Sequence, residues 1–350
     1  MSTADMGAMG ADASREQSVY DSPPPEPSAD APLDDASPPD RPLVSIGIPT
    51  YSRAEKLERA VGSVLGQTYA NLEVVISDNA SDDGTEAFCR ALCEREPRVR
   101  YLRSQVNLGP TANFNTVIDE LRGDYAMLLS DDDWLDPDYV ATCLAELRRA
   151  PGLVLACGIG RYLRDDEVLR GGVEMRLEQS SAPARVVAYV RDVDENGLFY
   201  GLMARSVMRR AAPLRNVLGN DWLLAAAIAA QGKATTLTGT SINRELDGTS
   251  ADFAKLCATL GLPGWQARIP HLVIASQLIA DIGWRAPAYR DLGPLARARL
   301  ACEAAWAAIR WRSLIWHMTT PSFAALRRRR GGRQLWSLYL WLARRAGGSL

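Results

Sequence analysis

The chain has 350 residues, of which 47% are hydrophobic and 23% charged, and its formal net charge is -2. These fractions are ordinary for a folded globular protein and exclude a wholly disordered, collagen-like or disulfide-scaffold chain. The six cysteines are scattered and the only histidines are His271 and His317, so neither a zinc site nor histidine-based catalysis is expected.

Charge is distributed unevenly along the chain. Residues 1–40 are acidic and rich in proline, whereas residues 285–350 contain thirteen arginines and two acidic residues. We expect residues 1–41 to form a disordered acidic tail, because so few apolar side chains cannot offset the entropy lost on ordering. The start lacks the pattern of a secretory signal, and no apolar run approaches the ~20 residues of a membrane-spanning helix. We therefore expect a cytoplasmic protein, either free or peripheral at the inner face of the membrane.

From Pro42 onward, strands and helices are predicted to alternate. The β-rich runs are Leu43–Pro49, Leu72–Ser77, Val99–Leu102 and Tyr125–Leu129, and apolar residues recur at helical spacing around residues 57–65, 85–96 and 114–121. This alternation predicts an α/β fold with a mostly parallel sheet and flanking helices, built with right-handed crossovers. Ligands of such sheets bind at the carboxyl ends of the strands.

The second half of the chain gives weaker patterns. Strands are predicted at Leu153–Cys157 and Leu198–Met203, helices at Arg205–Arg210, Leu223–Ala230, Leu295–Ile309 and Leu335–Leu342, and an irregular charged excursion at residues 163–197. The segment after residue 250 is rich in arginine and tryptophan. We expect its helices to pack on the core or on a second copy of the chain, with an anionic membrane surface as the alternative. No nucleic-acid-binding module is recognised.

Polar residues gather where three of the predicted strands end. The first strand leads into Thr50–Arg53, the second into Asp78–Asp83 and the fourth into Ser130–Asp133. No glycine-rich phosphate loop accompanies them, which argues against a dinucleotide-binding or P-loop protein.

Three consecutive carboxylates, Asp131–Asp133, follow the fourth strand. They repel one another at the end of a buried sheet unless a cation or protons relieve them, and Mg²⁺ or Mn²⁺ suits such oxygen ligands. The alternative is that Asp132 and Asp133 cap the next helix. Asp136–Asp138 offer another start for that helix downstream, which weakens the capping interpretation.

The succession VSIGIPTYSR, EVVISDNASDDGT, NLGPTANFN and YAMLLSDDDWLDPDYV, within Leu43–Arg149, resembles the nucleotide-sugar-binding half of family 2 glycosyltransferases of the GT-A fold. The resemblance implies a Rossmann-like GT-A domain in which residues 42–150 bind the nucleotide sugar and residues 151–250 face the acceptor. Residues 251–350 would form a helical extension. The implied activity is a metal-dependent, inverting transfer of a sugar from a nucleoside diphosphate to a hydroxyl or amine of a natural product, polysaccharide or glycolipid.

The resemblance also implies roles for single residues. Asp132 would bind Mn²⁺ or Mg²⁺, Asp131 would bind the ribose or the metal, and Asp133 would support them; Ser130 stands where many members carry the first acidic residue. Asp78 would accept a hydrogen bond from a pyrimidine base, so that the donor would be a UDP- or dTDP-sugar, although aspartate also suits a turn there. The remaining implied nucleotide-sugar contacts are Pro49, Thr50, Tyr51, Arg53, Ser81, Asn107, Gly109 and Arg244.

For some of these residues a purely structural role is as plausible as the implied role in binding or catalysis. Asn107 and Gly109 also suit a loop or a helix cap, and Arg244, expected in a flexible loop at residues 243–250, also suits a surface turn. Asp221 matches the family's general base at the start of an apolar helix, where aspartate is also a good cap. Asp192, Asp194 and Glu195 are the other candidates for the base.

Two further functions are weighed against sugar transfer. A nucleotidyltransferase of the same fold would need a glycine- and lysine- or arginine-rich triphosphate loop, which Thr50–Arg53 does not provide. An inactive, membrane-associated scaffold would not need three adjacent aspartates together with Asp78 and Asp221. A homodimer or a peripheral membrane contact through the C-terminal region is compatible with the sequence.

Overall fold

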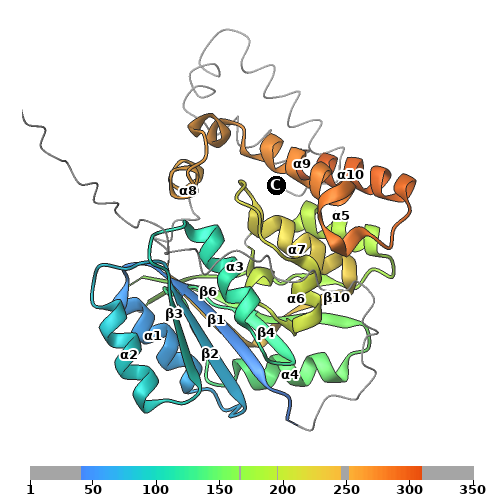
Figure 1. Cartoon of the computed structure of the whole chain (residues 1–350). Coiled ribbons are helices and arrows are strands. Elements are labelled where there is room, and N and C mark those ends of the chain that lie inside the picture. Colours follow the sequence, from blue (N-terminus) through green and yellow to red (C-terminus); the bar gives the residue numbers. More distant parts are fainter. Residues whose placement is uncertain (1–40, 165–166, 195, 246–251, 310–350) are drawn as a thin grey trace, which may run out of the picture. The chain divides into compact units, whose positions relative to one another are not determined.

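A ten-stranded sheet lies at the centre of the computed structural model, which describes residues 41–164, 167–194, 196–245 and 252–309. Helices flank the sheet (Figure 1). The strands are β1 (Val44–Thr50), β2 (Leu72–Asp78), β3 (Val99–Arg103), β4 (Tyr125–Leu128), β5 (Trp134–Leu135), β6 (Leu153–Arg164), β7 (Glu167–Gly171), β8 (Arg176–Leu177), β9 (Leu202–Ala204) and β10 (Lys233–Glu245). The α-helices are α1 (Ala54–Leu65), α2 (Thr85–Arg95), α3 (Pro110–Glu120), α4 (Tyr139–Arg149), α5 (Ala182–Asp192), α6 (Arg205–Ala211), α7 (Asn220–Gln231), α8 (Phe253–Thr259), α9 (Pro270–Ala280) and α10 (Pro294–Ile309).

Strand order separates a parallel half of the sheet from a mixed half. The order is β3-β2-β1-β4-β9-β6-β10-β5, with β7 beside β6 and β8 beside β10. The first four strands pair in parallel, as their alternation with helices predicts. Beyond them β9 runs antiparallel to both β4 and β6, while β10 runs parallel to β6. The predicted α/β class is confirmed, and the parallel arrangement is interrupted at β9.

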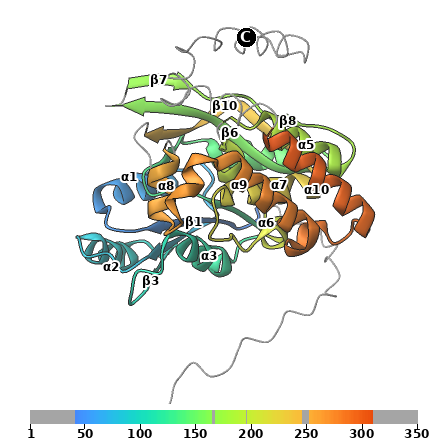
Figure 2. The ribbon, with the colours of Figure 1, turned by 90° about the horizontal axis from the view of Figure 1, so that it is seen from above.

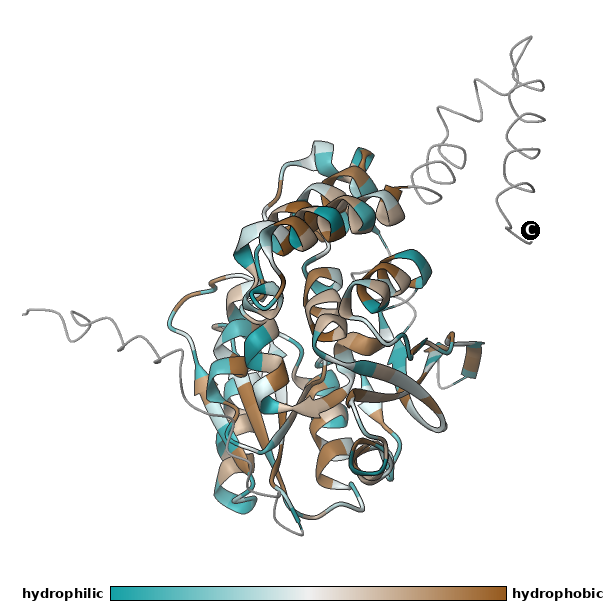
Figure 3. Ribbon diagram, turned by 90° about the vertical axis from the view of Figure 1, so that its right-hand side faces the viewer, coloured by the Kyte–Doolittle hydropathy of each residue, from teal (hydrophilic) through white to brown (hydrophobic). Residues whose placement is uncertain are grey.

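The core follows the predicted apolar pattern. Every residue of β1 and β2 is buried, and α1 buries Leu57, Ala60, Val61 and Val64, which lie on one helical face. In Figure 3 the hydrophobic colour runs along central strands. Gly47 lets α3 approach β1 closely, because a Cβ at this position would lie 2.0 Å from Val117 Cγ1.

Three expectations for the second half are wrong. Residues 163–197 are not irregular: they contain the end of β6, the strands β7 and β8, and α5, whose N-cap Ser181 accepts a hydrogen bond from the Ala184 amide at 3.3 Å. The strand predicted at 198–203 is a 3₁₀ turn (η1, Gly197–Tyr200) followed by the short β9. Residues 243–245 are not in a loop but end β10, which pairs with β6.

The helices after residue 252 cover one side of the core. Figure 1 shows α8, α9 and α10 above the sheet, and Figure 2 shows the same helices in front when the molecule is viewed from above. α9 and α10 pack against each other, and α10 packs on α5. The expected packing of the 295–309 helix on the core is confirmed, whereas the tail at residues 1–40 and the helix predicted at 335–342 lie outside the described residues. No helix in the described part of the chain is long and apolar enough to cross a membrane.

Candidate functional site

Strand register brings the predicted site residues together. Thr50 pairs with Asp78 across β1 and β2, and Gly47 pairs with Leu128 across β1 and β4. Continuing the second register by three residues places Thr50 level with Asp131. The Thr50 hydroxyl indeed donates a 2.8 Å hydrogen bond to Asp131 Oδ2. Two predicted clusters therefore share one edge of the sheet because their strands are parallel neighbours.

The aspartates Asp131–Asp133 lie in the turn between β4 and β5 rather than at a helix start. Helix α4 begins later, at Tyr139, so the interpretation of Asp132 and Asp133 as helix caps is wrong. Arg53, just before α1, places its Nη1 atom 3.1 Å from Asp131 Oδ1 and 3.0 Å from Asp132 Oδ2. One guanidinium nitrogen thus bridges two of the three carboxylates.

Burial makes this carboxylate cluster electrostatically costly. Desolvation raises the pKa of Asp131, although Arg53 opposes the shift. Desolvation also raises the pKa of Asp133, to about 7, against the opposing charge of Arg244. The Asp133 Oδ2 atom is buried without a hydrogen bond from the described residues, and its ion-pair partner is Arg244 Nε at 3.4 Å. The cluster is therefore short of positive charge and of donors.

This chemistry fits a divalent ion that is shared with a phosphate-bearing ligand. Mg²⁺ and Mn²⁺ take oxygen ligands, and Mg²⁺ is commonly held by one or two carboxylates together with substrate phosphates. Asp132 is the least buried of the three aspartates, and Asp133 Oδ2 is the buried acceptor that lacks a donor. Among the described residues, no group of three or more His, Cys, Asp or Glu is arranged to hold a metal by itself. Protein side chains alone would thus provide only part of a coordination shell.

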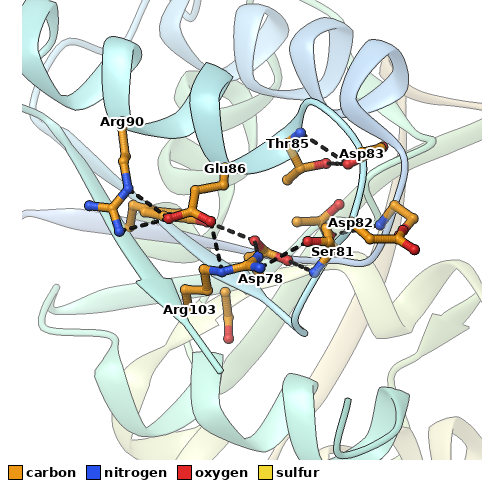
Figure 4. A network of polar contacts seen from close by, with 12 residues as sticks. Asp78, Ser81, Asp82, Asp83, Thr85, Glu86, Arg90 and Arg103 are labelled. Carbon is orange, nitrogen blue, oxygen red and sulfur yellow. Dashed lines mark hydrogen bonds and ion pairs between the residues drawn. The ribbon is translucent and has the colours of Figure 1, made fainter. Parts of the chain in front are cut away.

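Asp78 is the centre of a dense polar network at the end of β2 (Figure 4). Its side chain is fully buried and accepts hydrogen bonds from the Ser81 amide at 2.8 Å, the Tyr101 hydroxyl at 2.6 Å and Arg103 Nη1 at 2.6 Å. Arg103 also pairs with Glu86 at 3.0 Å. Burial alone would raise the pKa of Asp78, but these hydrogen bonds lower it overall. The carboxylate is held ionised with most of its acceptor sites occupied.

The loops after β1 and β2 are fastened to each other. Ser81 Oγ accepts the Ser52 amide at 2.8 Å, and Asp83 Oδ2 accepts the Ala54 amide at 3.1 Å. Ser52 and Ala80 both have positive φ angles, 50° and 65°, a conformation that non-glycine residues rarely adopt. These strained positions flank the candidate nucleotide pocket, which is where such strain is commonly found.

Other predicted donor-side residues differ in exposure and role. Pro49 is buried within β1, whereas Tyr51 is exposed beside the strand end. Gly109, with a φ of 84°, is the N-cap residue of α3, so its predicted capping role is confirmed. Asn107 Oδ1 accepts hydrogen bonds from the Gly109 amide and from Asn79 Nδ2, both at 2.8 Å. A structural role for Asn107 in this loop is thereby confirmed.

Asp221, from the half of the chain that the sequence assigns to the acceptor, is the second residue of α7. The N-cap of this helix is Gly219, with a φ of 80°, so Asp221 is in the first turn rather than at the cap. Its Oδ2 accepts a hydrogen bond from Asn196 Nδ2 at 3.1 Å. Desolvation raises the pKa of Asp221 despite this hydrogen bond. A carboxylate with a raised pKa at a helix start is suited to exchange a proton.

The other candidates for the base are placed less favourably. Asp192 ends α5 as an exposed residue paired with Arg191, and Asp194 is exposed in the loop that follows. Glu195 lies outside the described residues.

Arg244 joins the two sides of the site. Antiparallel pairing of Asn243 with Trp134 places Arg244 opposite Asp133 at the next position of the register. Its Nη1 donates to the Tyr162 hydroxyl at 3.0 Å, and its guanidinium carbon lies 5.0 Å from the centre of the Tyr200 ring. The charge of Arg244 acts to lower the pKa of both Asp133 and Asp221. A surface-turn role for Arg244 is wrong, because it lies on a strand inside the site.

Glu245 fastens the end of this strand to α1. Its carboxylate forms ion pairs with Lys56 and Arg59. The Arg59 guanidinium also stacks over the Trp134 ring at 3.8 Å. The ion pairs of Glu245 with α1 therefore help to hold its neighbour Arg244 beside Asp133.

Sequence reasoning missed several side chains that complete the site. Tyr101 and Arg103 end β3, where alternation predicts only a strand; Asn196 follows a charged segment, and Tyr200 shares a 2.8 Å hydrogen bond with Ser130. For Tyr101 and Arg103 a signal existed, because β3 is the parallel neighbour of β2. Asn196 and Tyr200 could be recognised as site residues only from the path that the chain takes after α5.

Comparisons with known proteins agree with this arrangement. The family model described as "Glycosyl transferase family 2" matches residues 45–200. Chondroitin synthase of Escherichia coli is 43% identical over 116 residues, which are 33% of this chain and 16% of that protein. Abequosyltransferase RfbV of Salmonella typhimurium is 41% identical over 102 residues, 28% of this chain and 31% of that protein. The chain thus spans less than a third of either relative.

Solved structures show the same fold at low sequence identity. The crystal structure of S. aureus TarS 1–349 superimposes with a TM-score of 0.55 and 12% identity, covering 80% of this chain and 75% of that chain. Its complex with UDP-GlcNAc gives a TM-score of 0.54 and 13% identity, covering 77% of this chain and 73% of that chain. Residues 45–200 therefore match the family 2 glycosyltransferase model, and the chain shares the GT-A fold of these glycosyltransferase structures.

Proposed function

We propose that the chain transfers a sugar from a nucleoside diphosphate sugar to an acceptor hydroxyl or amine. The observation that carries the proposal is the ion pair of Arg244 with Asp133 at 3.4 Å, together with the effect of the same arginine's charge in lowering the pKa of Asp221. The site of Asp131–Asp133 suits a metal ion and a diphosphate, and Asp221 suits the role of general base. A transferred sugar has to lie between these two functions, beside Arg244.

For the donor we propose a UDP- or dTDP-sugar. A base N–H would take the place of one of the hydrogen bonds that Asp78 now accepts from Ser81, Tyr101 and Arg103. Arg103 in turn offers donors to a base carbonyl. The UDP and UDP-GlcNAc complexes of TarS support a uridine nucleotide by analogy of fold. Pro49, Thr50, Tyr51, Ser81, Asn107 and Gly109 are the proposed remaining neighbours of the nucleotide.

For the metal we propose Mg²⁺ or Mn²⁺ held by Asp132, with Asp131 as second ligand or ribose contact. The ion would offset the charge of the departing diphosphate. Asp133 supports Asp132 from the buried side of the turn, and Arg244 neutralises Asp133. Arg53, which bridges Asp131 and Asp132, is able to turn its guanidinium to a diphosphate, a group that arginine binds well.

For the proton we propose Asp221 as the general base of an inverting transfer. The carboxylate accepts the proton of the attacking hydroxyl, and Asn196 orients it. The raised pKa of Asp221 makes it a stronger base than an exposed aspartate. The acceptor belongs to the natural products, polysaccharides or glycolipids, and contact with a membrane or a second copy would use the C-terminal region.

One experiment tests the proposal against its alternatives. The full chain is incubated with a panel of nucleoside diphosphate sugars, with Mn²⁺ or with a chelator, and release of nucleoside diphosphate is measured. Sugar transfer predicts metal-dependent release from a UDP- or dTDP-sugar, which Asp132→Asn abolishes. Release of pyrophosphate from a nucleoside triphosphate would instead support a nucleotidyltransferase. Absence of nucleotide binding to the folded protein would support a scaffold.

A further inference from the structure

The outer helices α9 and α10 have an unusual distribution of side chains. α10 buries small residues, Ala301, Ala304, Ala305 and Ala308 together with Leu300, against the rest of the protein. Two of its large apolar residues point outward: Leu295 is 85% exposed and Trp306 is 63% exposed. A water-facing helix normally shows the opposite pattern.

Four exposed residues of α10 lie on one face of the helix. Leu295, Arg299, Cys302 and Trp306 are all exposed, and their spacing of four, three and four residues places them in one stripe. Arg299 pairs with Glu303 at 2.7 Å on the same surface. The stripe is therefore apolar at both ends, with charge between them.

α9 carries an apolar face of its own. The helix contains no Asp, Glu, Lys or Arg, yet Leu272 and Ile279, two turns apart, are both exposed. Trp284, which follows in the π-helical turn η4 (Asp281–Arg285), is 68% exposed. Since α9 and α10 pack against each other, their outward faces belong to one outer layer of the molecule. We call Leu272, Ile279, Trp284, Leu295 and Trp306 the outer apolar face.

Charge decides which occupant suits this face. Arg285, Arg290 and Arg299 are exposed near it. The 41 residues that follow α10, 310–350, contain nine arginines, four tryptophans and no acidic residue. A second copy docked through the same face would bring the exposed arginines Arg285, Arg290 and Arg299 of the two copies together, which disfavours association. An anionic lipid surface would attract them, and each Lys or Arg near such a surface contributes about 1 kcal/mol.

The exposed side chains match the interface of a bilayer. Tryptophan is enriched at the level of lipid headgroups, and arginine extends its charge outward while its stem lies along apolar surface. α9, with 11 residues, is about 16 Å long, too short to cross a hydrocarbon core of about 30 Å. The geometry suits a helix that lies on the membrane rather than across it.

We propose that the outer apolar face of α9, η4 and α10 docks on an anionic bilayer. The same module borders the acceptor side of the site, because the His271 ring at the start of α9 lies 6.3 Å, centre to centre, from that of Trp222, the neighbour of Asp221. Docking would hold the acceptor side at the membrane surface. If the proposed glycosyl transfer is correct, on which this last step rests, the acceptor is carried by a lipid.

The test uses the full chain and sedimentation with vesicles, without donor or metal. We expect binding to vesicles of phosphatidylcholine with 30% phosphatidylglycerol, weak binding to pure phosphatidylcholine, and loss of binding as salt increases. Trp284→Ser combined with Trp306→Ser should lower the partition coefficient about tenfold or more, since each indole loses apolar contact with lipid. Val168→Ser with Leu169→Ser, two exposed apolar residues of β7, is the matched control and should bind like the parent.

Three outcomes would overturn the proposal. They are absence of binding to anionic vesicles, equal binding by the Trp284/Trp306 variant with an unchanged melting temperature, and a dimer in light scattering that this variant dissociates while vesicles are not bound. Asp221→Asn separates docking from catalysis, because it should bind vesicles like the parent whether or not the proposed transfer occurs.

Discussion

The proposed donor and acceptor sides of the site differ in how their polar side chains are held. On the donor side, Asp78 accepts three hydrogen bonds and Asp131 accepts from Thr50 and Arg53, all within one parallel sheet edge. On the proposed acceptor side, Asp221 accepts one hydrogen bond from another side chain, that of Asn196, and the others come from the backbone at the start of α7. On the proposed donor side, hydrogen bonds from other protein groups thus already hold the carboxylates in place before a ligand binds.

The difference has a physical consequence for ligands. Preformed networks lose little entropy when a ligand binds, and they tolerate few changes because a buried group that loses a partner is costly. Asp221 has a single side-chain partner, Asn196, so its replacement leaves fewer groups of other elements without a hydrogen bond. We therefore expect donor-side substitutions to change stability together with binding, and acceptor-side substitutions to change rate alone.

The largest effect is expected at Asp132, the proposed metal ligand. Asp132→Asn keeps the shape of the side chain but removes the charge that a divalent ion requires, so turnover should fall below detection at practical Mn²⁺ or Mg²⁺ concentrations. The rate at which nucleoside diphosphate is released measures this turnover. Circular dichroism should show the parental fold, and Asp194→Asn, at an exposed position, should keep the parental rate. Full activity of the Asp132 variant in chelator would remove the metal assignment.

The next effect concerns Asp221 and separates rate from stability. Asp221→Asn should slow transfer by about 10²–10⁴-fold, because an amide does not accept the proton. Donor affinity by calorimetry and the melting temperature should stay close to parental, since the helix is capped at Gly219. Asp192→Asn is the matched control. A parental rate for Asp221→Asn would move the base to another residue.

The same residue predicts a pH dependence. The base acts only when deprotonated, so kcat/KM should fall as pH decreases through its pKa. Because burial raises the pKa of Asp221, this fall should begin at a higher pH than for an ordinary aspartate. The pH–rate profile of the parent measures the limb, and the Asp221→Asn profile should lack it. An acidic limb that persists in the variant would belong to another group.

A smaller effect tests whether the donor side is preformed. Tyr101→Phe removes one hydrogen bond to Asp78 and should lower the free energy of unfolding by about 1–2 kcal/mol. UDP affinity should change less than about threefold, because Arg103 and the Ser81 amide still hold the carboxylate. Denaturant unfolding and calorimetry measure the two quantities. Asp78→Asn, in contrast, should reduce both; an unchanged affinity for UDP and dTDP would contradict the base contact.

The smallest effect is expected from the acidic tail. A chain that begins at Asp40 keeps the backbone of Arg41 and Pro42, whose carbonyls accept hydrogen bonds from Asn71 and Tyr69. Its rate and melting temperature should match those of the full chain. Loss of folding or of activity would show that residues 1–39 take part in the core or the site.

The parallel half of the fold could be predicted because local pattern and global topology agree there. Apolar spacing in α1 and the β-rich runs of β1, β2 and β4 determine the elements, and parallel pairing then places Thr50, Asp78 and Asp131 together. The mixed half could not be predicted in the same way. Whether residues 243–245 form a loop or the end of β10 depends on pairing with β6, about eighty residues earlier in the chain.

The candidate site shows the same division. Asp131–Asp133 and Asp221 stand out as acidic residues at element ends, which sequence reveals. Arg53 bridging two aspartates, or Arg244 reaching Asp133, depends on side-chain packing between distant strands. Tyr101 and Arg103 resemble ordinary strand residues, and only the parallel pairing of β3 with β2 indicates that they meet Asp78.

The left-handed backbone at Ser52 and Ala80 also bears on which substitutions the loops accept. Glycine adopts positive φ without the steric cost that a Cβ imposes, so Ala80→Gly should relieve local strain, while it increases the freedom of the unfolded chain. Valine or isoleucine at either position would add a branched Cβ to the same unfavourable conformation. Mutational scanning of the two loops should therefore find glycine and asparagine accepted and β-branched residues rejected, although Ser52 is only partly buried and Ala80 is not in the core.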